Sequence, residues 1–83
     1  MPTVLSLEGL RVAIYPNDHR PAHVHVIGAG VEAVFDLHCP HGPPVLRESH
    51  GFRLARVNRV VERLAAELDA LCAHWRSIHG DDG

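Results

Sequence analysis

Residues 52–79 contain no proline and no glycine, so a single helix can run through all of them. Their large apolar side chains recur at alternating steps of three and four residues, the period of a helix that packs along its whole length. These residues are Leu54, Val57, Val61, Leu64, Leu68, Leu71, Trp75 and Ile78. We therefore predict one long C-terminal helix over 52–79, ended by Gly80, with 80–83 as a tail.

The chain before this helix has the period of β-strands. Apolar and polar residues alternate in four segments that glycines or prolines separate. The segments are 3–7, 10–15, 22–27 and 31–37. We predict a single α+β domain over residues 1–83, with an antiparallel four-stranded meander within 1–48 packed on the long helix. Val45-Leu46 is a candidate for a further short edge strand.

The apolar pattern also predicts how the third and fourth of these strands pair. Residues that face each other across a hairpin point to the same side of the sheet, so Val24 and Phe35 share the core only if opposed residue numbers sum to an odd number. The tightest such pairing leaves Gly28-Ala29 as a two-residue turn with glycine first. It places His25 opposite Glu32 on the polar face.

The histidines of the third strand are the main candidates for chemistry. His23 and His25 are two positions apart, so their rings share one face about 6.5–7 Å apart along the backbone and can reach one metal ion. With Glu32 they form a predicted site for a divalent transition metal, to which His19 or Asp18 could add a ligand. Alternatively, His19, His23 and His25 are catalytic residues, a general base and a general acid for phosphodiester cleavage. A purely structural role also fits these rings.

The loop that leads into this strand is bounded by Pro16 and Pro21, which exclude a helix. Asn17 and Asp18 are suited to cap its turn. Together with Arg20, they are candidate binding residues for a ligand or partner.

The two cysteines, Cys39 and Cys72, are too few for a disulfide framework. The N-terminus has no signal-peptide pattern, so we expect both to be reduced thiols in the cytoplasm. The segment His38-Cys39-Pro40-His41 lacks the paired spacing of a zinc site, and we interpret it as a loop. No apolar run approaches the roughly 18–20 residues of a membrane span, so we expect no membrane partner.

Arginines gather near the start of the predicted helix. Residues 47–63 contain five arginines and two glutamates, so this segment has an excess of positive charge. The helix dipole disfavours positive charge at a helix N-terminus. A feature that costs local stability indicates contact with an anion, with nucleic acid or with an acidic partner. A solvated face whose arginine stems cover the apolar seam is the alternative. The candidate binding residues are Arg53, Arg56, Arg59 and Arg63.

The predicted helix is longer than the predicted sheet. A helix of this size spans about 40 Å, whereas a six-residue strand spans about 20 Å. We therefore expect the helix to overhang the sheet and to expose Trp75, a candidate contact residue in a homodimer or with a cognate protein. A helix that bends near Ala65-Ala66 and folds back over its own sheet is the competing expectation.

Several segments together resemble a small bacterial family, domain of unknown function 4160. The matching segments are Met1-Pro2-Thr3-Val4, the run Tyr15-Pro16-Asn17-Asp18-His19-Arg20-Pro21-Ala22-His23-Val24-His25-Val26, Glu32-Ala33-Val34-Phe35-Asp36-Leu37, Gly51-Phe52 and Trp75. The chain departs from the family pattern at Ala22, where a second proline is usual. It departs again at Arg53, where the family often has a serine that caps the helix, so we expect another cap, such as Ser49.

The resemblance implies no established activity, but it implies a genetic partner. Genes of this family often neighbour genes of domain of unknown function 2442, in pairs that look like toxin–antitoxin modules. Our first hypothesis is therefore a bacterial interaction protein, one component of such a two-gene module. The alternative is a metal-binding or histidine-based, RNA-cleaving protein that uses His23, His25 and Glu32.

Overall fold

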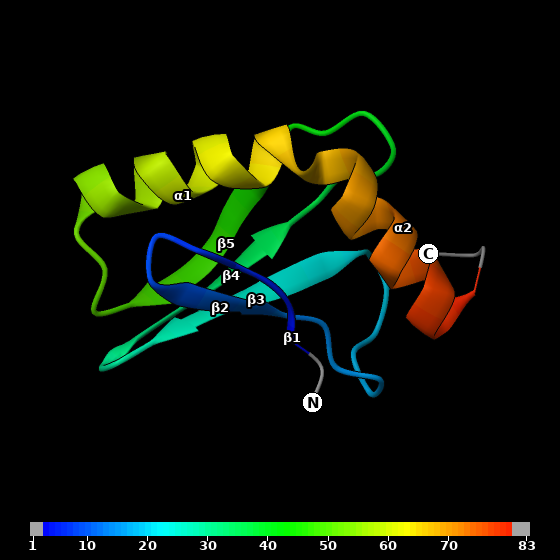
Figure 1. Ribbon diagram of the computed structural model, residues 1–83, viewed down its shortest axis with the longest axis horizontal. Helices are drawn as coiled ribbons and strands as arrows, with labels where there is room; N and C mark the ends of the chain where they lie inside the picture. Colours follow the sequence, from blue (N-terminus) through cyan, green and yellow to red (C-terminus); the bar gives the residue numbers. More distant parts are fainter. Residues whose placement is uncertain (1–2, 81–83) are drawn as a thin grey trace.

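The computed structural model describes residues 3–80 and contains one antiparallel sheet followed by two helices (Figure 1). The strands are β1 (Thr3–Leu7), β2 (Leu10–Ala13), β3 (His23–Gly28), β4 (Val31–Asp36) and β5 (Val45–His50), and the helices are α1 (Leu54–Ala66) and α2 (Leu68–His79). The sheet order is β1-β2-β3-β4-β5, so each strand pairs with the next one along the chain. The predicted α+β class and antiparallel meander are therefore confirmed. The predicted tail after Gly80 and the segment Met1-Pro2 lie outside the described residues.

The sheet has one strand more than predicted, because the candidate edge strand at Val45-Leu46 extends to His50. Five of the six β5 residues are exposed, so β5 lacks the apolar alternation that marks a half-buried strand. Its backbone pairing with β4 is what makes it a strand.

The main core lies between α1 and one face of the sheet. Val12, Val24 and Phe35 are fully buried on three adjacent strands, and Val60 and Leu64 are fully buried on α1. Figure 1 shows α1 lying across this sheet. A helix of 13 residues is about 20 Å long, which matches a six-residue strand.

The prediction of one uninterrupted helix over 52–79 is wrong. The helix begins at Leu54 after Arg53, whose position has no side-chain cap, so the expected cap from Ser49 is absent. Glu67 separates α1 from α2 with φ −107° and ψ 14°, outside helical geometry. The second helix then turns down past the end of β3 (Figure 1). This agrees with the competing expectation of a helix that bends near Ala65-Ala66. The sheet is too short for a straight helix, and the bend lets the second half cover the end of the sheet.

The bend also overturns the expected overhang. Trp75 is only 1% exposed, and Leu71 is fully buried. The apolar residues left exposed at the two helix ends are instead Leu54 and Ile78. Trp75 is therefore not an exposed contact residue for a homodimer, because the chain covers this side chain itself.

A disulfide joins Cys39, in the connection after β4, to Cys72 on α2. The expectation of two reduced thiols is therefore wrong. The two cysteines are separated by 33 positions, and only the folding of α2 over the end of the sheet brings them together. Reducing compartments keep thiols reduced, so the cysteines no longer support a cytoplasmic location.

In the pairing of β3 with β4, each β3 residue lies opposite a β4 residue two positions later than predicted. The sum is odd, as expected, but Gly28 pairs with Val31, and Ala29-Gly30 forms the turn. This strand position suits glycine, because a Cβ there would be 2.5 Å from the Leu10 side chain. The positive φ that the turn requires, +71°, falls on Gly30 instead.

Within residues 3–80, neither helix is both long and apolar enough to cross a membrane.

Candidate functional site

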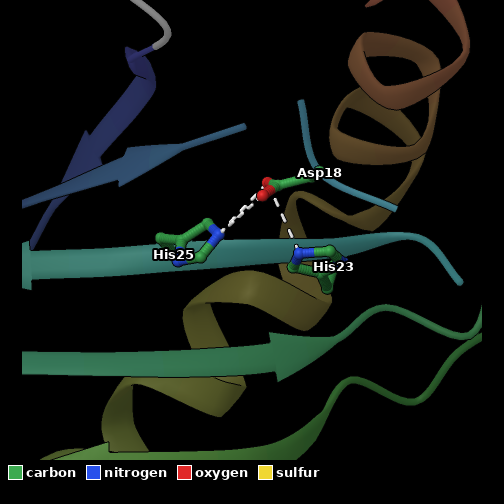
Figure 2. Close-up of side chains that lie close together, drawn as sticks. All are labelled: Asp18, His23 and His25. Atoms are coloured by element: carbon green, nitrogen blue, oxygen red, sulfur yellow. Dashed lines mark hydrogen bonds and ion pairs between the residues drawn. The ribbon is translucent and has the colours of Figure 1, made fainter. Parts of the chain in front are cut away.

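Asp18 is held at the centre of the site by a tight turn. The Asp18 backbone N–H donates to the carbonyl oxygen of Tyr15 at 3.0 Å, which closes a β-turn with Pro16 at its second position. The Tyr15 backbone N–H donates in return to Asp18 Oδ2 at 3.1 Å. These two bonds fix the carboxylate above the start of β3 (Figure 2).

His23 is buried, with its ring orientation fixed from one side. Its Nδ1 lies 2.9 Å from the carbonyl oxygen of Pro21, and a carbonyl can only accept, so Nδ1 carries a proton. In the neutral ring, Nε2 is then an acceptor. This Nε2 lies 3.4 Å from Asp18 Oδ2, so either a second ring proton, which would make an ion pair, or a metal ion could join the two atoms.

His25 faces the same carboxylate from two positions further along β3. Its Nε2 lies 3.1 Å from Oδ2 and 3.3 Å from Oδ1 of Asp18. Its Nδ1 is buried and has no hydrogen-bond partner. The ring therefore has one polar contact, and that contact is with Asp18.

Asp18, His23 and His25 together could hold a metal ion. They offer one carboxylate oxygen and two imidazole nitrogens, and these ligand atoms lie within 4.8 Å of one another. No other group of three such residues meets this condition in the part of the chain that the structure describes. Two histidines and one carboxylate are a ligand set for zinc or for non-haem iron.

The carboxylate in this cluster is not the predicted one. Glu32 is on the face of the sheet that carries His25, but it pairs with Ile27 and is exposed. Glu32 was expected directly opposite His25, and the register shift places it two pairs away along the ladder. Asp18, which was predicted only as a further possible ligand, takes the place of Glu32.

The other predicted loop residues surround the cluster without joining it. Asn17, His19 and Arg20 are exposed on the loop that carries Asp18. His19 is exposed and is not part of this cluster, so the structure brings together only two of the three predicted catalytic histidines.

Aromatic rings line both sides of the two histidines. The centroid of Tyr15 lies 4.8 Å from His25, and that of His23 lies 5.3 Å from His25. On the other side, Trp75 lies 5.3 Å from His23 and stacks on His79 at 3.9 Å. Trp75 therefore belongs to the core behind the cluster, rather than to an exposed contact surface.

Three of the four predicted arginines on the helix contact Glu8 in the turn between β1 and β2. Arg63 Nη1 donates to Glu8 Oε2 at 3.1 Å, and Arg59 Nε lies 3.6 Å from Oε1. Arg56 reaches the carbonyl oxygen of the same residue at 3.5 Å and also lies over the ring of Phe52. The fourth, Arg53, is exposed at the N-terminus of α1. This flank thus joins α1 to the first hairpin.

Replacing Glu8 with glutamine should lower the free energy of unfolding by no more than about 1 kcal/mol, because exposed ion pairs contribute little and salt screens them. The loss should shrink in high salt, measured as urea midpoints at two NaCl concentrations. Glu62→Gln, which neutralises an exposed carboxylate on α1, is the matched control and should have a smaller effect. An equal loss at both salt concentrations would contradict the electrostatic account.

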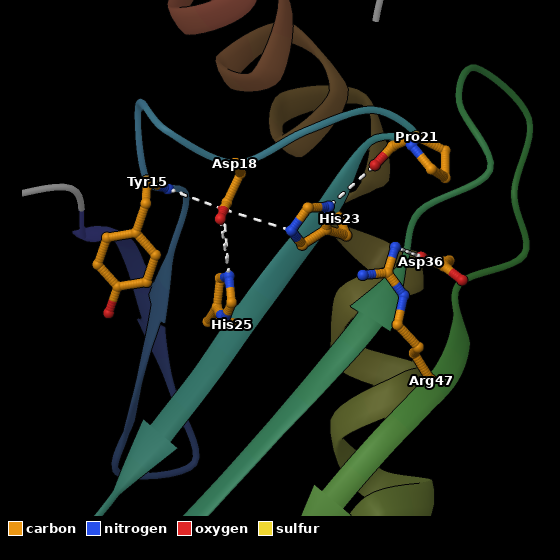
Figure 3. Close-up of polar contacts among 7 residues, drawn as sticks. All are labelled: Tyr15, Asp18, Pro21, His23, His25, Asp36 and Arg47. Atoms are coloured by element: carbon orange, nitrogen blue, oxygen red, sulfur yellow. Dashed lines mark hydrogen bonds and ion pairs between the residues drawn. The ribbon is translucent and has the colours of Figure 1, made fainter.

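Two polar residues near the cluster were not among the predicted site residues. Asp36 lies directly opposite His23 in the ladder, and Arg47 of β5 forms an ion pair with it (Figure 3). The register could have identified Asp36, because it is on the same polar face. Arg47 could be found only once β5 was known to pair with β4.

The meander, the helices that cover it and the partly buried His-Asp cluster define a small α+β protein with a histidine-rich site. The sequence matches the family described as Domain of unknown function (DUF4160) over residues 9–76, and the chain belongs to this family. The match includes all three residues of the cluster. No curated protein and no solved structure matches the sequence.

Proposed function

We propose that the protein binds one divalent transition-metal ion through Asp18, His23 and His25. The observation that carries this proposal is the convergence of two imidazole nitrogens on one carboxylate oxygen. His23 Nε2 and His25 Nε2 lie 3.4 and 3.1 Å from Asp18 Oδ2, while the Pro21 carbonyl oxygen accepts from Nδ1 of His23. A backbone carbonyl that orients a metal-binding imidazole through its other nitrogen is a recurrent arrangement in metal sites.

The three protein ligands leave coordination positions for water and for a substrate. A metal ion held in this way supplies a Lewis acid and an activated water molecule, which is the chemistry of hydrolysis. The chain itself positions the ligands. The Tyr15 N–H holds the carboxylate, the Pro21 carbonyl orients His23, and the rigid strand sets the spacing to His25.

Titration of the purified, chelator-treated protein with Zn²⁺ in a calorimeter should give one binding site per chain. Asp18→Asn keeps the size of the side chain but removes its charge, and should weaken zinc binding roughly 100-fold. Glu32→Gln is the matched control, because it removes an exposed carboxylate from the same sheet face and should leave the affinity unchanged.

Circular dichroism of each variant shows whether the fold is retained. Absence of zinc binding in the wild-type protein would overturn the proposal. A loss of zinc binding in Glu32→Gln with none in Asp18→Asn would assign the site to the other carboxylate.

A second candidate function is that of an interaction protein, one component of a toxin–antitoxin-like pair. The edge strand β5 favours it, since its outer edge has no neighbour in the sheet and Val45 and Leu46 are 46% and 36% exposed. Such an edge can pair with a strand from another chain. Co-expression with the product of a neighbouring gene, of the domain of unknown function 2442 type, tests this candidate by co-purification. Loss of the complex in Leu46→Lys would place the contact at β5.

A further inference from the structure

We propose that the metal site takes a phosphodiester group, with Arg47 binding one of its oxygens. This inference rests on the proposed function, because it places one anionic oxygen on the metal ion and a second one on the arginine. It adds a substrate class and a specificity residue to the site.

The position of Arg47 follows from an irregularity at the edge of the sheet. Val34 pairs with Glu48 and Phe35 pairs with Leu46, so Arg47 is an extra residue with no partner in β4. A β-bulge of this kind bends the strand and redirects a side chain, often next to a functional site. Here the side chain reaches Asp36, which lies on the face that carries His23.

The ladder places this guanidinium next to the metal ligands. Asp36 is directly opposite His23, and opposed Cβ atoms in an antiparallel pair are about 4.5–5.5 Å apart. In Figure 3 the guanidinium of Arg47 lies on the side of Asp36 that faces His23. The bond to Asp36 uses Nη2, and a guanidinium has five N–H donors in a planar fork. The remaining donors are therefore suited to an anion bound at the cluster.

A small oxyanion that bridges the two cations sets a limit on their spacing. A metal–oxygen bond of about 2.0–2.2 Å and an N–H···O bond of about 2.7–3.2 Å add up to roughly 5 Å. The separation of the two oxygens on one phosphorus atom supplies the rest of the span. The proposal therefore requires that the guanidinium of Arg47 and the metal ion lie no further apart than this span.

The charges favour an anion of charge −1. The site would contain a divalent metal ion, Asp18, Asp36 and Arg47, with both histidines neutral. Two carboxylates cancel the charge of the metal ion, which leaves the single positive charge of Arg47. A phosphodiester neutralises this charge, whereas a phosphate monoester near neutral pH carries about −1.5 to −2.

The test is a titration of the zinc-loaded protein with dimethyl phosphate, followed by ³¹P NMR. We expect saturable binding to the wild-type protein and at least about tenfold weaker binding to Arg47→Gln, since charge-assisted hydrogen bonds are worth about 1.5–3 kcal/mol. Arg76→Gln, which removes an exposed arginine from α2, is the matched control and should bind like the wild type. Zinc affinity, measured first without phosphate, is the reference for each variant and should be unchanged in Arg76→Gln.

Each result has a distinct meaning. Absence of zinc binding in the first titration means that the proposed function fails. Normal zinc binding without dimethyl phosphate binding, or with binding that Arg47→Gln does not weaken, overturns the phosphodiester inference alone. Acetate binding as tightly as dimethyl phosphate, with the same dependence on Arg47, would assign the site to carboxylates instead.

Discussion

Replacing Trp75 with alanine is expected to lower the free energy of unfolding by about 3–5 kcal/mol, the usual cost of removing a large buried aromatic side chain. Trp75 is among the largest fully buried side chains, and it packs between His23 and His79. A chain of 83 residues has a total stability of roughly 4–12 kcal/mol at typical values per residue. The variant should therefore be partly or largely unfolded, as measured by urea denaturation followed by far-ultraviolet circular dichroism.

Trp75→Phe is the matched control for this loss. Phenylalanine retains an aromatic ring against His23 and removes the buried indole N–H, which has no hydrogen-bond partner. We expect it to lose clearly less stability than Trp75→Ala. If Trp75→Ala costs less than about 1 kcal/mol, α2 does not pack behind the site as described.

Reducing the Cys39–Cys72 bond is expected to lower the free energy of unfolding by about 3–4 kcal/mol, because the bond closes a long loop in the unfolded chain. Urea denaturation with and without dithiothreitol measures the difference. The Cys39→Ser variant should match the reduced wild-type protein and should not respond to the reductant.

Mass spectrometry of the purified protein with a thiol-alkylating reagent checks the same bond directly. Alkylation of both cysteines under native, non-reducing conditions would contradict the disulfide. A reductant that changes the stability of Cys39→Ser as much as that of the wild type would show that the effect does not come from this bond.

Most of the sheet could be predicted because its apolar alternation is local. Four strands and the turn at Glu8-Gly9 follow from period and from glycine positions alone. The polar strand β5 has no such pattern, and its partner β4 defines it. The break at Glu67 likewise has no glycine or proline to mark it in the sequence. It depends on the length of the sheet beneath the helix, which the local helical period does not show.

The site could be predicted in part for a similar reason. His23 and His25 share a face because of the period of a strand, and that required only their spacing. The choice between Asp18 and Glu32 depended on the β3–β4 register, in which Gly28 belongs to the strand and not to the turn. The Cys39–Cys72 contact depends on where α2 lies relative to the sheet. The periods of the strands and helices do not predict this position.

The order of the strands has a consequence for how the domain folds. Every strand pairs with its neighbour in the chain, so the sheet needs no long-range closure, and folds with local contacts form quickly. The three residues of the cluster lie within the short stretch 18–25. The hairpin of β2 and β3 around this stretch can form before the helices fold onto the sheet. During synthesis from the N-terminus, the ligands would therefore come together first, and Trp75 would close the core behind them last.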